Sequence, residues 1–286
     1  MYGDGRDWNQ KELSILGDIS IAVPVTIYDN GRHSNPDVHD PPFQGTLLFV
    51  PGALLANGRG ADPAADWEKM TEGGQIDPEG YYRLYERRLL PPLLYANDKV
   101  EEMGRSALIT LPGIGCGFFS GPFHHQLGEE LKRVLIRLLK THVERLPHIK
   151  AVYFDPYREC KNERHQIGHI SFFIRPLTKE NEAKPQLCRP ERYEEEGDDF
   201  SNCELFSIVA WDHVSWPGND FYSGLRQSDD GVKAAATNSM QAMTGVEGFC
   251  DPDVHKYLPP KPYHTWKQVV NEGGMRIKVE GNLSVY

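Results

Sequence analysis

The sequence predicts an α/β fold in which helices cover both faces of a parallel or mixed β-sheet. Short runs rich in apolar and β-branched residues alternate along the chain with amphipathic stretches, which is the pattern of strands connected by helices. No linker-like segment divides the 286 residues into separate parts. We therefore expect one domain spanning residues 1–286.

Strands are expected where apolar runs are short and end at turn-forming residues. The run at 19–27 alternates β-branched and other residues, and the run at 106–111 stops at Pro112-Gly113. The predicted strands cover residues 19–27, 46–50, 106–111, 149–154, 170–174, 206–211 and 275–279.

Helices are expected at 62–70, 81–90, 126–146 and 231–243. The third is the strongest prediction, since its leucines fall on one stripe and its charged residues on the opposite face. Asp62 and Pro63 form a helix start, and Pro91-Pro92 would end the helix that begins at 81.

An acidic segment separates the last two central strands. Residues 178–203 contain Pro185 and Pro190 and the run Glu194-Glu195-Glu196-Gly197-Asp198-Asp199, without helical or strand periodicity. This composition predicts a solvated insertion on the surface of the domain.

Charge and composition exclude several classes of protein. The net charge of −10 argues against a binding protein for nucleic acid, which needs a basic face. No stretch approaches the ~20 apolar residues that span a membrane, and residues 1–4 do not begin a signal peptide. The five cysteines form no CxxC pair, which favours a reducing compartment, so we expect a cytoplasmic protein.

A glycine-rich segment follows the strand predicted at 106–111 and precedes the strongest helix. It reads Leu111-Pro112-Gly113-Ile114-Gly115-Cys116-Gly117-Phe118-Phe119-Ser120-Gly121-Pro122. Glycines let a backbone turn its N–H groups toward an anion, and a helix N-terminus adds positive charge, so this segment predicts a phosphate-binding loop. It matches neither the P-loop nor the dinucleotide fingerprint, and a tight structural loop is the alternative.

A second segment places three acidic residues after the strand predicted at 206–211. Asp212 follows the strand, Asp220 lies in a loop with Trp216, Gly218 and Asn219, and Asp230 stands at a helix start. Because open α/β sheets bind ligands beyond the carboxyl ends of their strands, we expect the three carboxylates to converge on one pocket. Alternatively, Asp229 or Asp230 is only a helix N-cap.

Two other groups of residues are candidate sites. Cys160, His165 and His169 have a spacing that could bind a metal, but no fourth ligand is near in the sequence, so no metal or cofactor is expected. His124-His125 is interpreted as a solvated pair at a helix start.

Together, the glycine-rich segment and the segment that contains Asp212, Asp220 and Asp230 resemble the macrodomain family. The similarity is greatest to the atypical macrodomain ADP-ribosylhydrolases typified by the Legionella effector MavL and its eukaryotic relatives, in which three functional aspartates have the spacing of Asp212, Asp220 and Asp230. The resemblance covers about 107–123 and 206–243. It implies a macrodomain-like three-layer α/β/α sandwich. The Asn-Ala-Asn motif of common macrodomains and the signature of poly-ADP-ribose glycohydrolases are absent.

The resemblance also implies an activity, the hydrolysis of mono-ADP-ribose from protein arginine, including arginine on ubiquitin. Asp212, Asp220 and Asp230 would be catalytic, with Asp220 contributing most, Asp212 orienting ligand or water and Asp230 recognising the guanidinium. The residues implied to bind ADP-ribose are Gly113, Ile114, Gly115, Cys116, Gly117, Phe118, Phe119, Trp216, Gly218 and Asn219.

Carboxylates suit this chemistry because cleavage at the ribose C1 develops an oxocarbenium-like positive charge. We expect a monomeric hydrolase whose partners are ADP-ribose and an ADP-ribosylated protein. Two alternatives remain open. One is a non-catalytic reader of ADP-ribose, and the other is a protein that binds no ADP-ribose and contacts its partner through the acidic insertion.

Overall fold

The computed structural model describes residues 17–58, 60–211, 218 and 220–273. Its centre is a seven-stranded sheet with the order β1-β2-β9-β5-β6-β8-β7. β2, β9, β5, β6 and β8 run parallel, while β1 and β7 pair antiparallel at the two edges. The predicted mixed sheet is therefore confirmed. Its strands are β1 (Ile21–Asp29), β2 (Val38–Pro51), β5 (Ser106–Pro112), β6 (Ile149–Asp155), β7 (Glu163–Ile167), β8 (Ile170–Ile174) and β9 (Cys203–Trp211).

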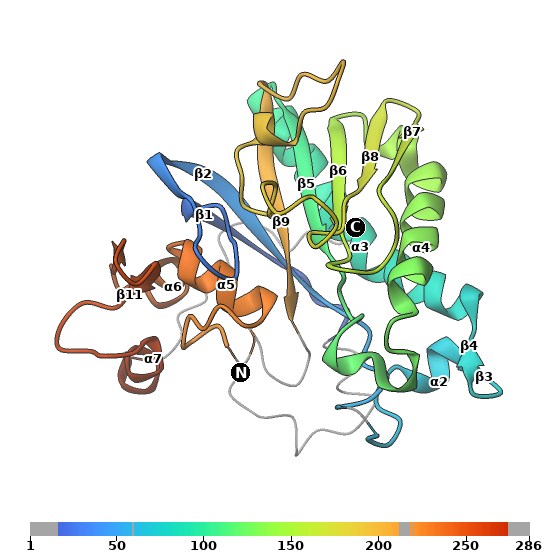
Figure 1. Cartoon of the computed structure of the whole chain (residues 1–286), viewed down its shortest axis with the longest axis horizontal. Helices are drawn as coiled ribbons and strands as arrows, with labels where there is room; N and C mark the ends of the chain where they lie inside the picture. Colours follow the sequence, from blue (N-terminus) through green and yellow to red (C-terminus); the bar gives the residue numbers. More distant parts are fainter. Residues whose placement is uncertain (1–16, 59, 212–217, 219, 274–286) are drawn as a thin grey trace.

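Helices pack on both faces of this sheet and make it the middle of three layers (Figure 1). One face is covered by α3 (Pro78–Met103) and α4 (Leu127–His142). The other is covered by α5 (Asp229–Ala236), α6 (Ser239–Thr244) and α7 (Trp266–Gly273). Short elements complete the fold: α2 (Trp67–Met70), β3 (Thr71–Glu72), β4 (Gln75–Ile76), β10 (Phe249–Asp251), β11 (Lys256–Leu258) and the 3-10 turns η1 (Phe118–Phe123), η2 (Val143–Arg145) and η3 (Pro190–Tyr193).

The acidic segment 178–203 helps to cover the second face. It contains η3, and it buries Leu187, Tyr193 and Phe200 in the core on that side of the sheet. Arg175, which directly follows β8, donates to the carboxylate of Glu195 at 2.7 Å. Part of the acidic run at 194–199 is therefore paired with a cation at the end of a central strand. This insertion is therefore anchored in the fold as well as acidic.

The helix expected to stop at Pro91-Pro92 instead continues through both prolines. The 26-residue α3 contains Pro91 and Pro92, because its buried face goes on to Leu93 and Val100. Pro92 has no N–H to give to the carbonyl of Arg88. That carbonyl accepts a hydrogen bond from Ser20 Oγ at 3.5 Å instead. A tertiary contact thus satisfies the acceptor that proline leaves open, and the predicted helix end was wrong.

Three other boundaries differ from the predictions. The helix expected at 62–70 shrinks to α2, and the strand expected at 46–50 is the end of the longer β2. The helix expected at 231–243 is divided at Thr237, whose extended backbone pairs with Ile27 of β1. β7 was not predicted, and the strand expected at 275–279 lies outside the described residues.

Within the described ranges, no helix is both long and apolar enough to cross a membrane.

Candidate functional site

Four parallel strands end together at one edge of the sheet. β2 and β9 end in register at Pro51 and Trp211, and β5 and β6 end in register at Pro112 and Asp155. The chain therefore leaves these four strands at the same edge, below the sheet in the view of Figure 1. This is where open α/β sheets bind ligands.

The glycine-rich loop begins at this edge with a buried, tightly held part. Ile114 and Cys116 are buried, and Gly115 has a φ of +74°. A Cβ on Gly115 would lie 2.5 Å from the Tyr85 hydroxyl and 2.8 Å from the Ala53 nitrogen. Gly115 is therefore required by the packing of the loop itself, as the structural alternative proposed.

The outer part of the loop is open. A Cβ on Gly117 would meet no protein atom within 4 Å, and the neighbouring Phe118 is 65% exposed. Phe119 anchors this part, since its carbonyl accepts the N–H groups of Leu55 and Ala56 at 3.1 and 3.2 Å. Gly117 and Phe118 are thus the residues of the loop that a ligand can reach most directly.

The loop after β2 joins the glycine-rich loop to the end of β9. The N–H of Gly52 donates to the carbonyl of Trp211 at 3.3 Å. A Cβ on Gly52 would overlap the backbone nitrogen of Gly115, so the two chains are in direct contact there. The glycine-rich loop and the end of β9 consequently lie on either side of Gly52 at this edge.

A buried ion pair that the sequence analysis missed holds the loop after β2. Arg88 of α3 donates to the carbonyl of Gly52 and to Asp66 Oδ1, both at 2.9 Å. Asp66 Oδ2 accepts the N–H of Leu54 at 2.9 Å, and both charged side chains are fully buried. The available signal was an arginine at helical spacing from Tyr81 and Tyr85, on the apolar stripe of a helix.

Two of the three predicted acids, Asp220 and Asp230, are brought together by Ser228. Ser228 Oγ lies 2.8 Å from Asp220 Oδ2 and within hydrogen-bonding distance of Asp230 Oδ1. The N–H of Asp220 donates to Asp230 Oδ2 at 3.0 Å. Gly218, with a φ of +132°, packs so closely on the Asp230 carboxyl that any Cβ would overlap it. Asp212, Trp216 and Asn219 lie outside the described residues.

The two joined acids differ in burial. Asp230 is 7% exposed, whereas Asp220 is only partly covered. Burial, and then the negative charges of Asp229 and Asp220, raise the pKa of Asp230 to about 6. The N-cap of α5 is Ser228, so neither Asp229 nor Asp230 has the capping role that was the alternative reading.

Asp229 has a different task at the same edge. Its Oδ2 accepts the N–H of Ala210 in β9 at 2.8 Å, and its Oδ1 accepts Lys233 Nζ at 2.6 Å. Lys233 is 1% exposed and also donates to the carbonyl of Ile208 and to Gln186 Oε1. Burial lowers the pKa of Lys233. This pair ties the start of α5 to the end of β9, and its signal was a lysine within an alanine-rich helix.

A further buried acid ends β6. Asp155 Oδ1 accepts the N–H groups of Tyr157 and Leu177, both at 2.8 Å, and burial raises the pKa of Asp155 to about 6. Tyr157, with a φ of +59°, leaves its ring 45% exposed beside this edge. The sequence analysis missed both residues, although they follow a predicted strand just as Asp212 does.

The two histidines among the candidate metal ligands have other hydrogen-bond partners. His169 Nε2 donates to the carbonyl of Leu146 at 2.8 Å, and His165 Nε2 lies 3.1 Å from Glu163. Cys160 is buried. Among the described residues, no group of three or more His, Cys, Asp or Glu side chains is arranged to hold a metal ion.

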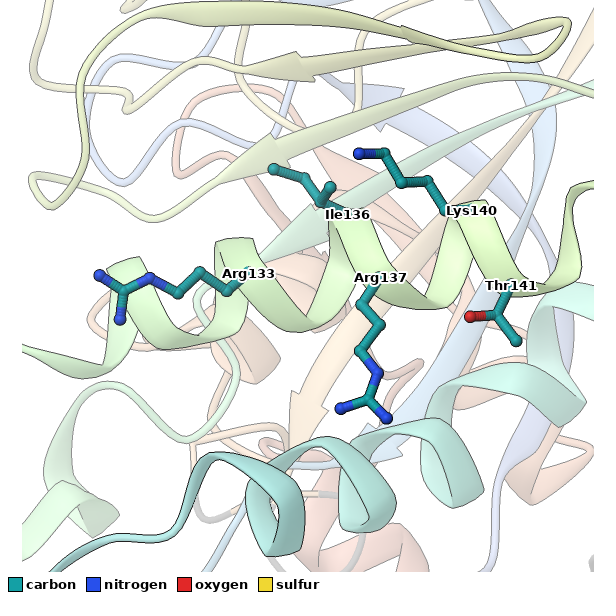
Figure 2. A pocket seen from close by; sticks show the side chains of 5 residues that line it. All are labelled: Arg133, Ile136, Arg137, Lys140 and Thr141. Atoms are coloured by element: carbon teal, nitrogen blue, oxygen red, sulfur yellow. The ribbon is translucent and has the colours of Figure 1, made fainter.

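A surface depression of about 380 Å³ lies elsewhere, on the outer face of α4. It is lined by Arg133, Ile136, Arg137, Lys140 and Thr141 (Figure 2). Arg137 points toward α3, where it pairs with Glu79, and Arg133 pairs with Glu130. This half of α4 leads to the start of β6, at the edge opposite the acids, so we do not assign it to the site.

Comparison with known proteins agrees with the geometry. The family model described as "Macrodomain effector MavL" matches residues 1–263, which include the glycine-rich loop and all three predicted acids. No curated protein matches the chain. The match supports an ADP-ribose-binding macrodomain. The chain belongs to the MavL family of macrodomain effectors.

Proposed function

We propose that this protein is an ADP-ribosylhydrolase that removes mono-ADP-ribose from arginine side chains. The observation that carries the proposal is the Asp220–Ser228–Asp230 group, which the neighbouring Asp229 holds near the end of β9 through its bond to Ala210, at the edge where the glycine-rich loop begins. A reader of ADP-ribose needs backbone donors and one polar anchor. Two joined carboxylates in unequal surroundings, one buried and one partly exposed, are instead typical of glycosyl-transfer chemistry.

The binding step would use the open part of the glycine-rich loop. Gly117 lets backbone N–H groups approach the diphosphate without a Cβ in the way. The exposed rings of Phe118 and Tyr157 offer apolar faces to the base and ribose. The predicted contacts of Trp216, Gly218 and Asn219 with ADP-ribose remain part of this proposal.

The chemical step would break the bond between the ribose C1 and a guanidinium nitrogen. Its transition state places positive charge on the ribose, which the carboxylate of Asp220 would stabilise while it accepts a proton from the attacking water. Asp220 is our choice because it is the more exposed acid, whereas both oxygens of Asp230 already have protein partners. Asp212 is proposed to orient the ligand or the water.

The proposed substrate is a protein, and ubiquitin carrying an ADP-ribosylated arginine is included. The net charge of −10 favours encounter with a cationic protein surface. We further propose that the enzyme acts as a monomer in the cytoplasm. No metal or cofactor is proposed, so turnover should continue in excess chelator.

The test is incubation with matched peptides ADP-ribosylated on arginine, glutamate or serine, with free ADP-ribose as the readout. We expect catalytic release from the arginine linkage and a loss of about 10²–10³ in kcat for Asp220→Asn. Asp253→Asn, at an exposed aspartate far along the chain, is the matched control. Tight binding without release from any linkage would replace this proposal with a reader function. Ubiquitin is tested by comparing kcat/KM for modified ubiquitin with that for the arginine peptide.

A further inference from the structure

Ser228 lies between two carboxylates that belong to different parts of the chain. Its Oγ is 2.8 Å from Asp220 Oδ2, on the segment after β9, and within hydrogen-bonding distance of Asp230 Oδ1, on α5. The N–H of Asp220 closes the group by donating to Asp230 Oδ2 at 3.0 Å. The three side chains therefore form a line, carboxyl, hydroxyl, carboxyl, that is held at both ends.

The number of hydrogen atoms in this line determines whether it can transfer a proton. A serine hydroxyl has one hydrogen to donate, so it can serve only one of two ionised carboxylates at a time. When a single proton is added to either carboxyl group, every O···O contact in the line contains one hydrogen. The added proton can then leave at the opposite end, because the hydroxyl accepts it on one side while donating its own hydrogen on the other.

The surroundings make the two ends unequal. Asp230 is buried, whereas Asp220 is partly exposed. Among the described residues, the charged groups that act on Asp230 are Asp220 and Asp229, with Lys233 one helical turn further along α5. Burial and the two acids raise the pKa of Asp230 to about 6, which makes it the better resting place for the proton.

We infer that Ser228 is a positioning residue that passes a proton from Asp220 to Asp230 during hydrolysis. This inference rests on the proposed function. The attacking water loses a proton to Asp220 as its oxygen bonds to the ribose C1 and the C1–N bond breaks toward the guanidine. Asp220 then donates that proton to Ser228 Oγ, whose own hydrogen moves to Asp230 Oδ1. Asp220 is again a carboxylate, and Asp230 holds the proton until it is released to solvent or to the guanidine.

Three substitutions separate this role from the capping of α5. Ser228→Asn keeps an N-cap side chain but has no hydroxyl to pass a proton, Ser228→Thr keeps both, and Ser228→Ala keeps neither. With the arginine-linked peptide we expect kcat to fall about 100-fold in Ser228→Asn and Ser228→Ala, and to stay within about threefold of wild type in Ser228→Thr. Wild-type kcat in Ser228→Asn would overturn the inference.

The pH profile provides the readout that a merely structural role would not give. Turnover of the wild type should fall with acid around pH 6, where Asp230 becomes protonated and can no longer receive a proton. In Ser228→Ala turnover should no longer follow the protonation of Asp230, because the line is broken and Asp230 receives no proton from Asp220. The pKa of Asp230 itself, followed by carboxyl NMR, should move upward, since the hydroxyl stabilises its ionised form. If the kinetic limb moved upward together with the NMR pKa, the relay would be wrong.

Failure of the relay and failure of the proposed function give different results. An inactive wild type on all three linkages would remove the proposed hydrolysis, and the relay with it. An active wild type whose Ser228→Ala variant has the same kcat and acid limb would remove the relay alone. The NMR titration of Asp230 needs no substrate, and an ordinary carboxyl pKa in the wild type would also contradict the relay.

Discussion

The hydroxyl of Tyr85 donates a hydrogen bond to the backbone carbonyl of Ile114 at 2.8 Å. The same hydroxyl accepts the N–H of Ala53 at 3.1 Å. One buried side chain of α3 thus connects the loop after β2 to the glycine-rich loop after β5. The open residue Gly117 lies three positions after Ile114, so the position of the proposed phosphate site depends on a tyrosine that need not touch the ligand.

Tyr85→Phe should therefore weaken ADP-ribose binding. The substitution leaves the N–H of Ala53 buried without its partner, which typically costs about 1–3 kcal/mol of unfolding free energy. We expect a measurable fall in affinity by calorimetry as well as this loss in denaturant unfolding. Tyr153→Phe is the control, because the buried Tyr153 hydroxyl has no hydrogen-bond partner among the described residues. Equal effects of the two substitutions would show that the link is not important.

Gly117→Val should abolish ADP-ribose binding while leaving the fold intact. The new side chain meets no protein atom near its Cβ, but it fills the space through which a diphosphate would approach. Gly273→Val, at another glycine with open space, controls for the substitution itself. Calorimetry should find no binding for the first variant and wild-type affinity for the second, and wild-type affinity for a folded Gly117→Val protein would contradict the loop assignment.

Gly115→Val should behave differently from its neighbour. Its Cβ would collide with Tyr85 and with the backbone of Ala53, at a left-handed φ that a β-branched residue rarely adopts. Gly115 and Gly117 lie in one glycine-rich segment, and the sequence does not distinguish their roles. The structure shows that a loss of binding in Gly115→Val would report unfolding as well as the site.

Asp230→Asn should stabilise the protein at neutral pH while reducing turnover. The pKa of Asp230 is raised in the folded state, so its contribution to stability is fully present below pH 4 and is lost as pH rises through about 6. An amide avoids that loss, can still accept from the N–H of Asp220 and can donate to Ser228. We expect a gain of about 1–3 kcal/mol at pH 7.5, with little difference from wild type at pH 4. A variant less stable than wild type at pH 7.5 would contradict the raised pKa.

Lys233→Met should be strongly destabilising. It removes three hydrogen bonds and leaves the carboxylate of Asp229 without its buried cation. Breaking a buried ion pair typically costs about 3–5 kcal/mol. Lys99→Met, which breaks the exposed Lys99–Glu102 pair on α3, should cost only about 0–1 kcal/mol. Urea unfolding of both variants checks the difference, and similar small losses would mean that Lys233 does not hold α5 on β9.

Local sequence patterns determined much of this protein. Apolar runs that stop at Pro-Gly located β5 and the end of β2, and the leucine stripe located α4, because these patterns lie within one element. The glycine-rich loop and the acids Asp220 and Asp230 were likewise predicted as a site from local patterns. Their signals are contained within about a dozen neighbouring residues, and the strand before each of them places it at the end of the sheet.

Only the tertiary structure decided which partners complete these elements. α3 continues through Pro91-Pro92 because its buried face goes on to Leu93 and Val100, and Ser20, far away in the sequence, offers a donor to the carbonyl of Arg88. Asp230 is buried against Asp220 because Ser228 and Gly218 allow the segment after β9 to fold back on α5. The sequence shows which chemical groups each residue carries. The free-energy cost of placing a proline in a helix, or of ionising a carboxyl group, depends on the atoms around that group. Those atoms come from segments that only the folded chain brings together.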